Sequence, residues 1–245
     1  MGKNEDMEET MKKQLTVTWY GHAAFLLESP SGTKVLIDPW LENPKAPANA
    51  VRNVGANLIL VTHGHNDHVG NTVEVAARTV ATVVAIHEVA LYLGRKGVAK
   101  VQSMNKGGSV ELLNIKITMV DARHSGDIDV DEVPIAGGEP AGYVIEFENG
   151  FRAYHAGDTG PFLDMRLLNQ LYKPHLAIVP IGGLFTMGPR EAAMACTMIR
   201  PKFIIGMHYG TFPPLTGTPE QLKKHLPPSM RKMVRKLKPG ISLAF

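Results

Sequence analysis

Short apolar runs separated by turn residues recur along the chain and predict a protein built mainly on β-strands. Leu58–Thr62 and Leu176–Ile181 are continuously apolar, which is typical of strands buried on both faces of a sheet. Leu15–Trp19 instead alternates, as an antiparallel strand with one wetter face does. The predicted strands are Leu15–Trp19, Ala23–Glu28, Lys34–Asp38, Leu58–Thr62, Thr82–Ile86, Val110–Leu113, Ile115–Val120, Tyr143–Phe147, Phe151–His155, Leu176–Ile181 and Phe203–Met207.

Helical patterns are fewer and lie between the strands. Pro189 and Pro219 stand at the starts of two of them, where the fixed φ of proline suits the first helical turn. The predicted helices are Asn71–Arg78, His87–Gly94, Phe162–Leu171, Pro189–Ile199, Pro219–Leu226 and Ser229–Lys236. Apolar residues recur at helical spacing in the basic stretch Lys223–Lys238, which predicts a docked helix with a solvated basic face. A phosphate- or RNA-binding face is the alternative for that stretch.

Length, charge and cysteine content narrow the class of protein. Two sheets flanked by helices are the simplest packing of these elements, and 245 residues suit one large α/β domain. We expect a tail at 1–13 and a single domain over 14–245. No apolar run reaches the roughly 18–20 residues of a membrane span, and the charged start does not resemble a secretory signal. A single cysteine, Cys196, fits the reducing cytoplasm, and a net charge of +3 is too mild to favour nucleic acid.

The motif that carries chemistry follows the apolar run Leu58–Thr62. It reads His-Gly-His-Asn-Asp-His over 63–68, so that four metal-ligand side chains stand close together, namely His63, His65, Asp67 and His68. Imidazole and carboxylate ligands suit zinc and also accept manganese or iron. Four ligands at this spacing divide into two pairs, and neither pair completes a coordination shell. The motif therefore predicts a metal site that needs ligands from elsewhere in the chain.

Three further positions qualify as those distant ligands. His124, Asp158 and His208 each follow a predicted strand, and loops at the carboxyl ends of strands converge at one edge of a sheet. Each has glycine nearby in the sequence, which gives the backbone freedom to turn. We therefore expect them to meet the 63–68 motif at that edge.

The order of these motifs resembles the metallo-β-lactamase superfamily over almost the whole chain. The stretches 19–28 and 35–41, beginning Trp-Tyr-Gly-His and Val-Leu-Ile-Asp, are similar to its lactonase-like and phospholipase-D-like branch, near L-ascorbate-6-phosphate lactonase. The stretches 137–143 and 180–189 are similar to the same branch. The resemblance implies a four-layer αββα sandwich with two metals at one edge of the sheets.

The resemblance also implies a distribution of ligands. The first metal takes His63, His65 and His124, and the second takes Asp67, His68 and His208. Asp158 bridges the two. Asp38 is then a carboxylate that orients a metal-bound histidine, with a turn or helix-capping role as the alternative. His22, in the opening motif of the family, is a candidate proton donor or substrate contact, with a hydrogen-bonded structural histidine as the alternative. Tyr209 adjoins His208 and is a candidate support for an oxyanion, with a side chain that faces away from the site as the alternative.

These expectations favour a hydrolase in which a hydroxide shared by two divalent ions, most simply Zn²⁺, attacks an ester, lactone or phosphoester of a small substrate. A phosphodiesterase acting on nucleotides, RNA or phospholipid is the first alternative. A metal-binding regulatory protein without turnover is the second. The loops Leu41–Asn53, Ser125–Pro140 and Gly182–Pro189 are candidates for substrate selection, and a homo-oligomer is compatible with the sequence.

Overall fold

Two seven-stranded sheets form the centre of the molecule in a computed structural model that describes residues 14–245. The predicted tail at 1–13 lies outside the described residues, and the single domain over 14–245 stays a prediction. The first sheet has the order β16-β1-β2-β3-β4-β5-β6. Its strands are β1 (Thr16–Trp19), β2 (Phe25–Glu28), β3 (Lys34–Ile37), β4 (Leu58–Val61), β5 (Thr82–Ile86), β6 (Val101–Met104) and β16 (Ser242–Ala244).

The second sheet has the order β15-β14-β13-β12-β11-β8-β7. Its strands are β7 (Ser109–Leu112), β8 (Ile115–Asp121), β11 (Ala141–Glu146), β12 (Arg152–His155), β13 (Leu176–Pro180), β14 (Phe203–Met207) and β15 (Val234–Arg235). Both sheets are mixed: β3 to β6 run parallel, as do β12 to β15, and the remaining neighbours are antiparallel. A small third sheet is a hairpin of β9 (Ile128–Val130) and β10 (Val133–Ile135).

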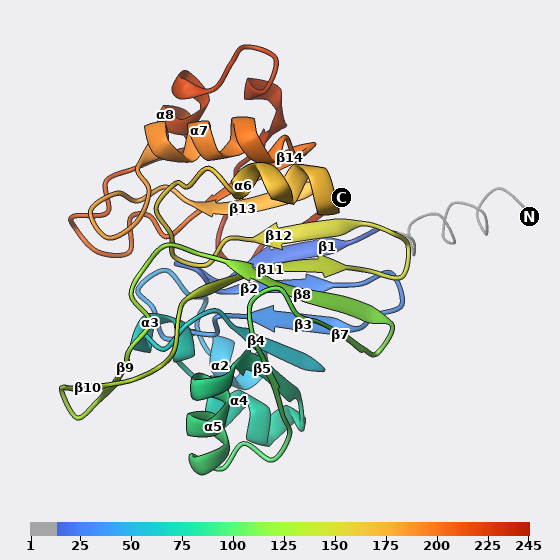
Figure 1. Ribbon diagram of the computed structural model, residues 1–245, viewed down its shortest axis with the longest axis vertical. Coiled ribbons are helices and arrows are strands. Elements are labelled where there is room, and N and C mark those ends of the chain that lie inside the picture. Colours follow the sequence, from blue (N-terminus) through green and yellow to red (C-terminus); the bar gives the residue numbers. More distant parts are fainter. Residues whose placement is uncertain (1–13) are drawn as a thin grey trace, which may run out of the picture.

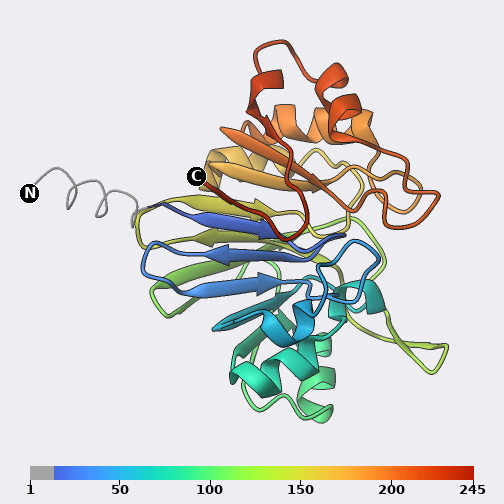
Figure 2. The ribbon, with the colours of Figure 1, turned by 180° about the vertical axis from the view of Figure 1, so that it is seen from behind.

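The two large sheets face each other across a common apolar core. Figures 1 and 2 show β1–β3 lying over β8 and β11 when the molecule is seen from either side. Tyr143 on β11 fixes this packing, because its buried hydroxyl donates to the carbonyl oxygen of Val61 at the end of β4, 2.9 Å away. A buried tyrosine needs such a partner for its hydroxyl.

Helices cover the outer sides of the sandwich. Figure 1 shows α4 and α5 at one end and α7 and α8 at the other, with the strands between them. The helices are α2 (Ala50–Asn53), α3 (Asn66–Val69), α4 (Thr72–Thr79), α5 (His87–Arg95), α6 (Met165–Leu167), the π-helical η1 (Leu168–Tyr172), α7 (Pro189–Ile199), α8 (Pro219–His225) and the 3₁₀ turn η2 (Arg231–Met233). The αββα sandwich is therefore confirmed. Within residues 14–245 no helix has the length and apolarity to cross a membrane.

The predicted helix over Ser229–Lys236 is wrong. The chain there makes only the short turn η2, and Val234 then pairs in parallel with Ile204 of β14. Val234 is buried by this pairing. Pairing as an edge strand satisfies backbone groups of β14 that would otherwise stay unpaired. This gain in hydrogen bonding outweighs the preference for a helix that the spacing of the apolar residues indicates.

Candidate metal centre

The motif at 63–68 forms a tight loop that ends in one turn of helix. It leaves β4 after Val61, and the helical turn α3 starts at Asn66 with His65 as its N-cap. This turn was not predicted. It places His68 on its buried side, while His63 lies buried directly after the strand. Because a helical turn follows the strand so closely, the side chains of the motif point toward two neighbouring positions.

Gly64 lets a second loop approach the motif. A Cβ at this position would lie 2.6 Å from the carbonyl oxygen of Gly126 and 2.6 Å from Cγ1 of Ile128. We therefore expect Gly64→Ala to destabilise the protein by about 1–3 kcal/mol, because both neighbours are held in packed structure. Thermal unfolding should show this as a Tm lowered by roughly 5 °C.

Gly55→Ala is the matched control for that variant. The nearest atom to its Cβ would be Cδ of Lys34 at 3.4 Å, the flexible part of a long side chain, so little change in Tm is expected. Equal Tm values for Gly64→Ala and the wild type would contradict the close packing on Gly64.

Three histidines form the first donor group: His63, His65 and His124, with one ring nitrogen of each within 4.8 Å of those of the other two. Nε2 of His63 faces Nδ1 of His65 at 2.9 Å. Burial lowers the pKa of all three imidazoles, that of His63 well below its usual value. Neutral imidazoles carry the free lone pair that a metal ion needs.

The second donor group contains Asp67, His68 and His208 together with His22. Nε2 of His208 lies 3.9 Å from Oδ2 of Asp67, and Nε2 of His68 lies 4.0 Å from Oδ1 of the same carboxylate. Burial raises the pKa of Asp67, but His68 and His22 more than offset this and hold it well below its usual range. This group therefore brings an ionised carboxylate together with imidazoles.

Asp158 lies between the two groups, on the loop that follows β12. Its Oδ2 is 3.2 Å from Nε2 of His68 and 3.0 Å from Nε2 of His208, both in the second group. The same oxygen lies 3.7 Å from Nε2 of His124, in the first group. One carboxylate therefore adjoins donors of both groups.

The donor atoms fit a cation because several of them are buried with no hydrogen-bond partner. These atoms are Nε2 of His68, Oδ1 of Asp158, and both ring nitrogens of His208; the two Nε2 atoms lie close to Oδ2 of Asp158 but not in hydrogen-bonding geometry. A buried polar atom left unpaired costs about 1–3 kcal/mol, so such atoms are rarely gathered without a ligand. Burial lowers the pKa of His68, yet the carboxylates of Asp158, Asp38 and Asp67 outweigh this and raise it well above its usual value. The carboxylates around His68 thus favour a positive charge beside this residue, and a divalent ion would supply it.

Asp38 supports one histidine of each group. Its fully buried carboxylate accepts a hydrogen bond from Nδ1 of His68 at 2.8 Å and another from Oγ1 of Thr62, also at 2.8 Å. Because Thr62 donates to Asp38, its hydroxyl oxygen is free to accept from Nδ1 of His63, 2.9 Å away. Both imidazoles are thereby held with Nε2 toward the donor groups. Thr62 was not identified from the sequence, which carries no separate signal for it.

His22 lies at the second donor group, fully buried, with both ring nitrogens already paired. Nε2 is 3.1 Å from Oδ2 of Asp67, and Nδ1 is 3.0 Å from Oγ1 of Thr211. Burial lowers the pKa of His22 to about 4, so the ring is neutral near pH 7. A neutral ring that donates from Nε2 and accepts at Nδ1 satisfies both contacts, and it orients the Asp67 carboxylate.

The ring of Tyr209 contacts Trp19 and Lys45. Its ring stacks on Trp19 with centroids 5.2 Å apart, and the Lys45 ammonium lies over it at 5.5 Å. Burial raises the pKa of its hydroxyl to about 12. The position of Tyr209 thus gives no support to its predicted role at an oxyanion.

A cavity of about 280 Å³ opens beside the donors. It is lined by His65, Asp67, His124, Ser125, Asp158, Phe185 and His208. The lining therefore combines residues of both donor groups with one exposed aromatic side chain, that of Phe185. Phe185 belongs to the loop Gly182–Pro189, one of those predicted to select the substrate.

Fold and donor set together define the class of protein, a metallo-β-lactamase fold with a histidine- and aspartate-rich centre. Residues 16–208 match a family model described as a β-lactamase superfamily domain. A metal-dependent hydrolase of the UPF0173 family from Methanopyrus kandleri is 50% identical over 213 residues, covering 86% of this chain and 91% of the relative. One from Methanosarcina mazei is 46% identical over 230 residues, covering 94% and 98%.

The chain therefore belongs to the metallo-β-lactamase superfamily and, within it, to the UPF0173 family of metal-dependent hydrolases. A solved structure agrees with this placement. A metallo hydrolase of the hyperthermophilic archaeon Ignicoccus hospitalis superposes with a TM-score of 0.85 at 34% identity, covering 95% of this chain and 98% of the other.

Proposed function

We propose that this chain is a hydrolase that holds two divalent cations and cleaves an ester, lactone or phosphoester bond of a small substrate. His63, His65 and His124 would hold one ion, and a second group would hold the other. That second group is Asp67, His68 and His208. The observation that supports a paired site is the contact of Oδ2 of Asp158 with donors of both groups.

Two bound cations would supply a hydroxide at neutral pH, because metal binding can lower the pKa of a coordinated water from 15.7 to about 7. The chain itself supplies orientation and a shaped cavity. Asp38 and Thr62 hold two of the imidazoles in the tautomer that presents Nε2. His22 holds the Asp67 carboxylate in place.

The cavity favours a small substrate. At about 280 Å³ it is near the lower end of the range for small-molecule sites. Phe185 offers an apolar surface on one side, and Oγ of Ser125 lies 3.2 Å from Nε2 of His65 on another. Among residues 14–245 no lysine or arginine lines this cavity, which favours an uncharged ester or lactone over a polyanionic substrate such as RNA.

Hydrolysis measured after metal removal and return tests the proposal. The chain is stripped with a chelator, reloaded with Zn²⁺, Mn²⁺ or Fe²⁺, and offered p-nitrophenyl esters, lactones and bis-p-nitrophenyl phosphate. We expect turnover of an ester or lactone that depends on the returned metal. Preference for the phosphodiester would support the phosphodiesterase alternative instead. Bound metal without turnover on any member of the panel would contradict a hydrolase and support the regulatory alternative.

Asp38→Asn should weaken metal binding by about 10–100-fold, because an amide keeps the shape of the side chain but loses the charge that orients His63 and His68. Competition with a chromogenic chelator measures this affinity. Asp164→Asn changes an exposed aspartate at the start of α6 and should leave the affinity unchanged. Equal affinities for Asp38→Asn and the wild type would contradict the supporting role of Asp38.

A further inference from the structure

The β9–β10 hairpin projects away from the rest of the molecule. Figures 1 and 2 show it standing clear of the sandwich, beside the loops at one edge of the sheets. Its two strands pair with each other, and within residues 14–245 they pair with no further strand. A lone two-stranded hairpin is marginally stable in water, so a projecting hairpin of this kind points to a partner.

The hairpin exposes apolar and acidic side chains: Val133 follows the turn Asp131–Glu132 at its tip, and Ile135 lies opposite Ile128 nearer its base. Val133 and Ile135 are 59% and 41% exposed. Asp129, Asp131 and Glu132 are also exposed, and none of them forms an ion pair within the described part of the chain. Apolar residues gathered on a projecting surface mark an interaction site more often than isolated ones do. The acidic neighbours favour a partner with positive charge.

The base of the hairpin, in contrast, is firmly packed. Ile128 is buried, and a Cβ placed on Gly137 would lie 3.0 Å from its Cγ1. Ile128 also packs on Gly64, inside the metal-binding motif. The hairpin is therefore a rigidly rooted arm with an unpartnered tip.

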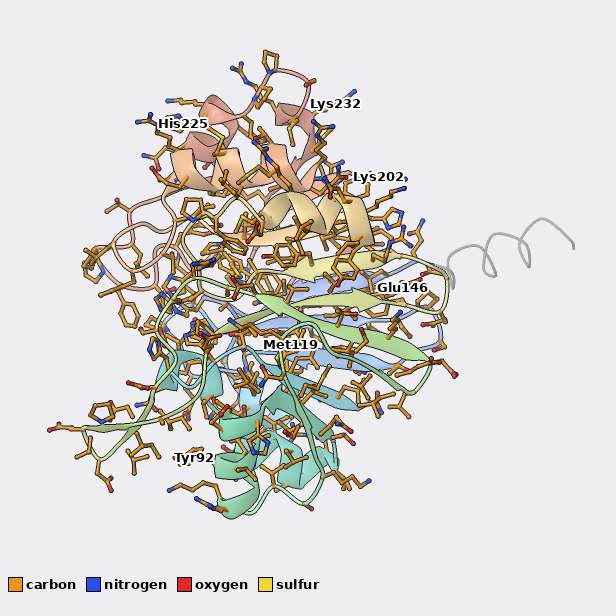
Figure 3. All side chains as sticks on the ribbon, viewed as in Figure 1. Tyr92, Met119, Glu146, Lys202, His225 and Lys232 are labelled. Atoms are coloured by element: carbon orange, nitrogen blue, oxygen red, sulfur yellow. The ribbon has the colours of Figure 1, made fainter. Side chains whose placement is uncertain are left out.

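A groove with complementary properties lies between α6–η1 and α7, at the other side of the molecule. Its volume is about 720 Å³, and its lining includes Phe162, Leu163, Met194, Met198, Arg166 and Arg200. Leu163 and Met194 are 72% and 60% exposed. Neither arginine forms an ion pair within residues 14–245. Figure 3 labels Lys202, His225 and Lys232 around this same end, which adds further basic side chains there.

We propose that the hairpin of one copy of this chain docks in the α6–α7 groove of a second copy. Val133 and Ile135 would cover the exposed Leu163 and Met194, while the acidic residues of the tip would pair with Arg166 and Arg200. Because arm and groove are different surfaces, the contact is head-to-tail, and repeating it produces a ring if the rotation closes. The acidic tip disfavours an anionic lipid surface as the occupant, since like charges would repel.

Docking of the hairpin on a second copy would affect the loop that lines the metal centre. The arm is continuous with the segment that carries His124 and Ser125, and its base packs on Gly64. Docking of the tip would therefore restrain the loop that supplies a donor and part of the cavity lining.

Light scattering after size-exclusion chromatography tests the proposal with exposed-residue variants. The mean mass of the wild type should rise above that of a monomer as the protein concentration increases from roughly 1 to 100 µM, a range that brackets a micromolar Kd. The arm variant Val133→Glu/Ile135→Glu and the groove variant Leu163→Glu/Met194→Glu should each run as monomers, and a mixture of the two should form dimers through the one intact contact. Leu91→Glu, an exposed leucine on α5, is the control and should assemble like the wild type. A monomeric wild type, or an assembly that survives either variant, would overturn the proposal.

A disulfide experiment tests the particular pairing of arm and groove. The single native cysteine, Cys196, is buried, so it does not interfere. A Val133→Cys/Leu163→Cys variant should form covalent dimers and larger species on mild oxidation, in at least about tenfold greater yield than Val133→Cys/Leu91→Cys. Equal yields from the two variants would show that the arm docks elsewhere and would contradict the groove as its partner.

Discussion

Replacing Asp158 by asparagine is expected to lower hydrolysis by at least about a thousandfold, since several kcal/mol of transition-state stabilisation depend on the metal pair. Asp158 is the only carboxylate whose oxygen lies within 4 Å of His124 in one donor group and of His68 and His208 in the other, among residues 14–245. The amide keeps the size of the side chain but loses its charge. Metal content should therefore fall together with activity, while the fold is retained. Elemental analysis, steady-state kinetics and circular dichroism measure the three quantities.

The matched control is Asp127→Asn, which removes an exposed aspartate from the hairpin segment near the cavity. It should keep the metal content of the wild type and most of its activity. An Asp158→Asn protein that retains both metal and turnover would contradict a shared role of the Asp158 carboxylate in binding both ions.

Removal of the metal should lower thermal stability by a comparably large amount. Ligand that binds only the folded state at a thousandfold excess over its Kd stabilises by about 4.1 kcal/mol. For a chain of this size that corresponds to a Tm about 10 °C higher with metal than without. A bound cation would also give a partner to the buried atoms of His68, Asp158 and His208 that form no hydrogen bond. Calorimetry with and without a chelator measures the shift.

The chelator saturated beforehand with zinc serves as the control for non-specific effects and should leave Tm unchanged. The shift produced by free chelator should be much smaller in Asp158→Asn, because that variant has less metal to lose. A wild-type Tm that does not respond to chelation would contradict metal binding at this centre.

The sequence predicted the framework of the fold because burial leaves a clear pattern. Each predicted strand is present within about two residues, including β4 and β13, whose residues are buried throughout. The strands that were missed are short or largely polar, such as β6 and β16. They lie at the edges of the sheets, where half of each strand faces solvent and the hydrophobic pattern is weak.

The sequence predicted the donor residues of the site that directly follow strands. His124, Asp158 and His208 follow strands and do meet the 63–68 motif, as convergence at a sheet edge requires. The position of a residue after a strand does not predict the direction in which its side chain points. Tyr209 follows a donor in sequence yet stacks on Trp19, and the contact of His22 with Asp67 depends on how separate loops pack.

Anomalous X-ray scattering from crystals of the zinc-loaded protein would locate the bound ions. We expect two peaks per chain, one among His63, His65 and His124 and the other among Asp67, His68 and His208, with the Asp158 carboxylate between them. A single peak at saturating zinc, or peaks away from these side chains, would contradict the proposed paired site.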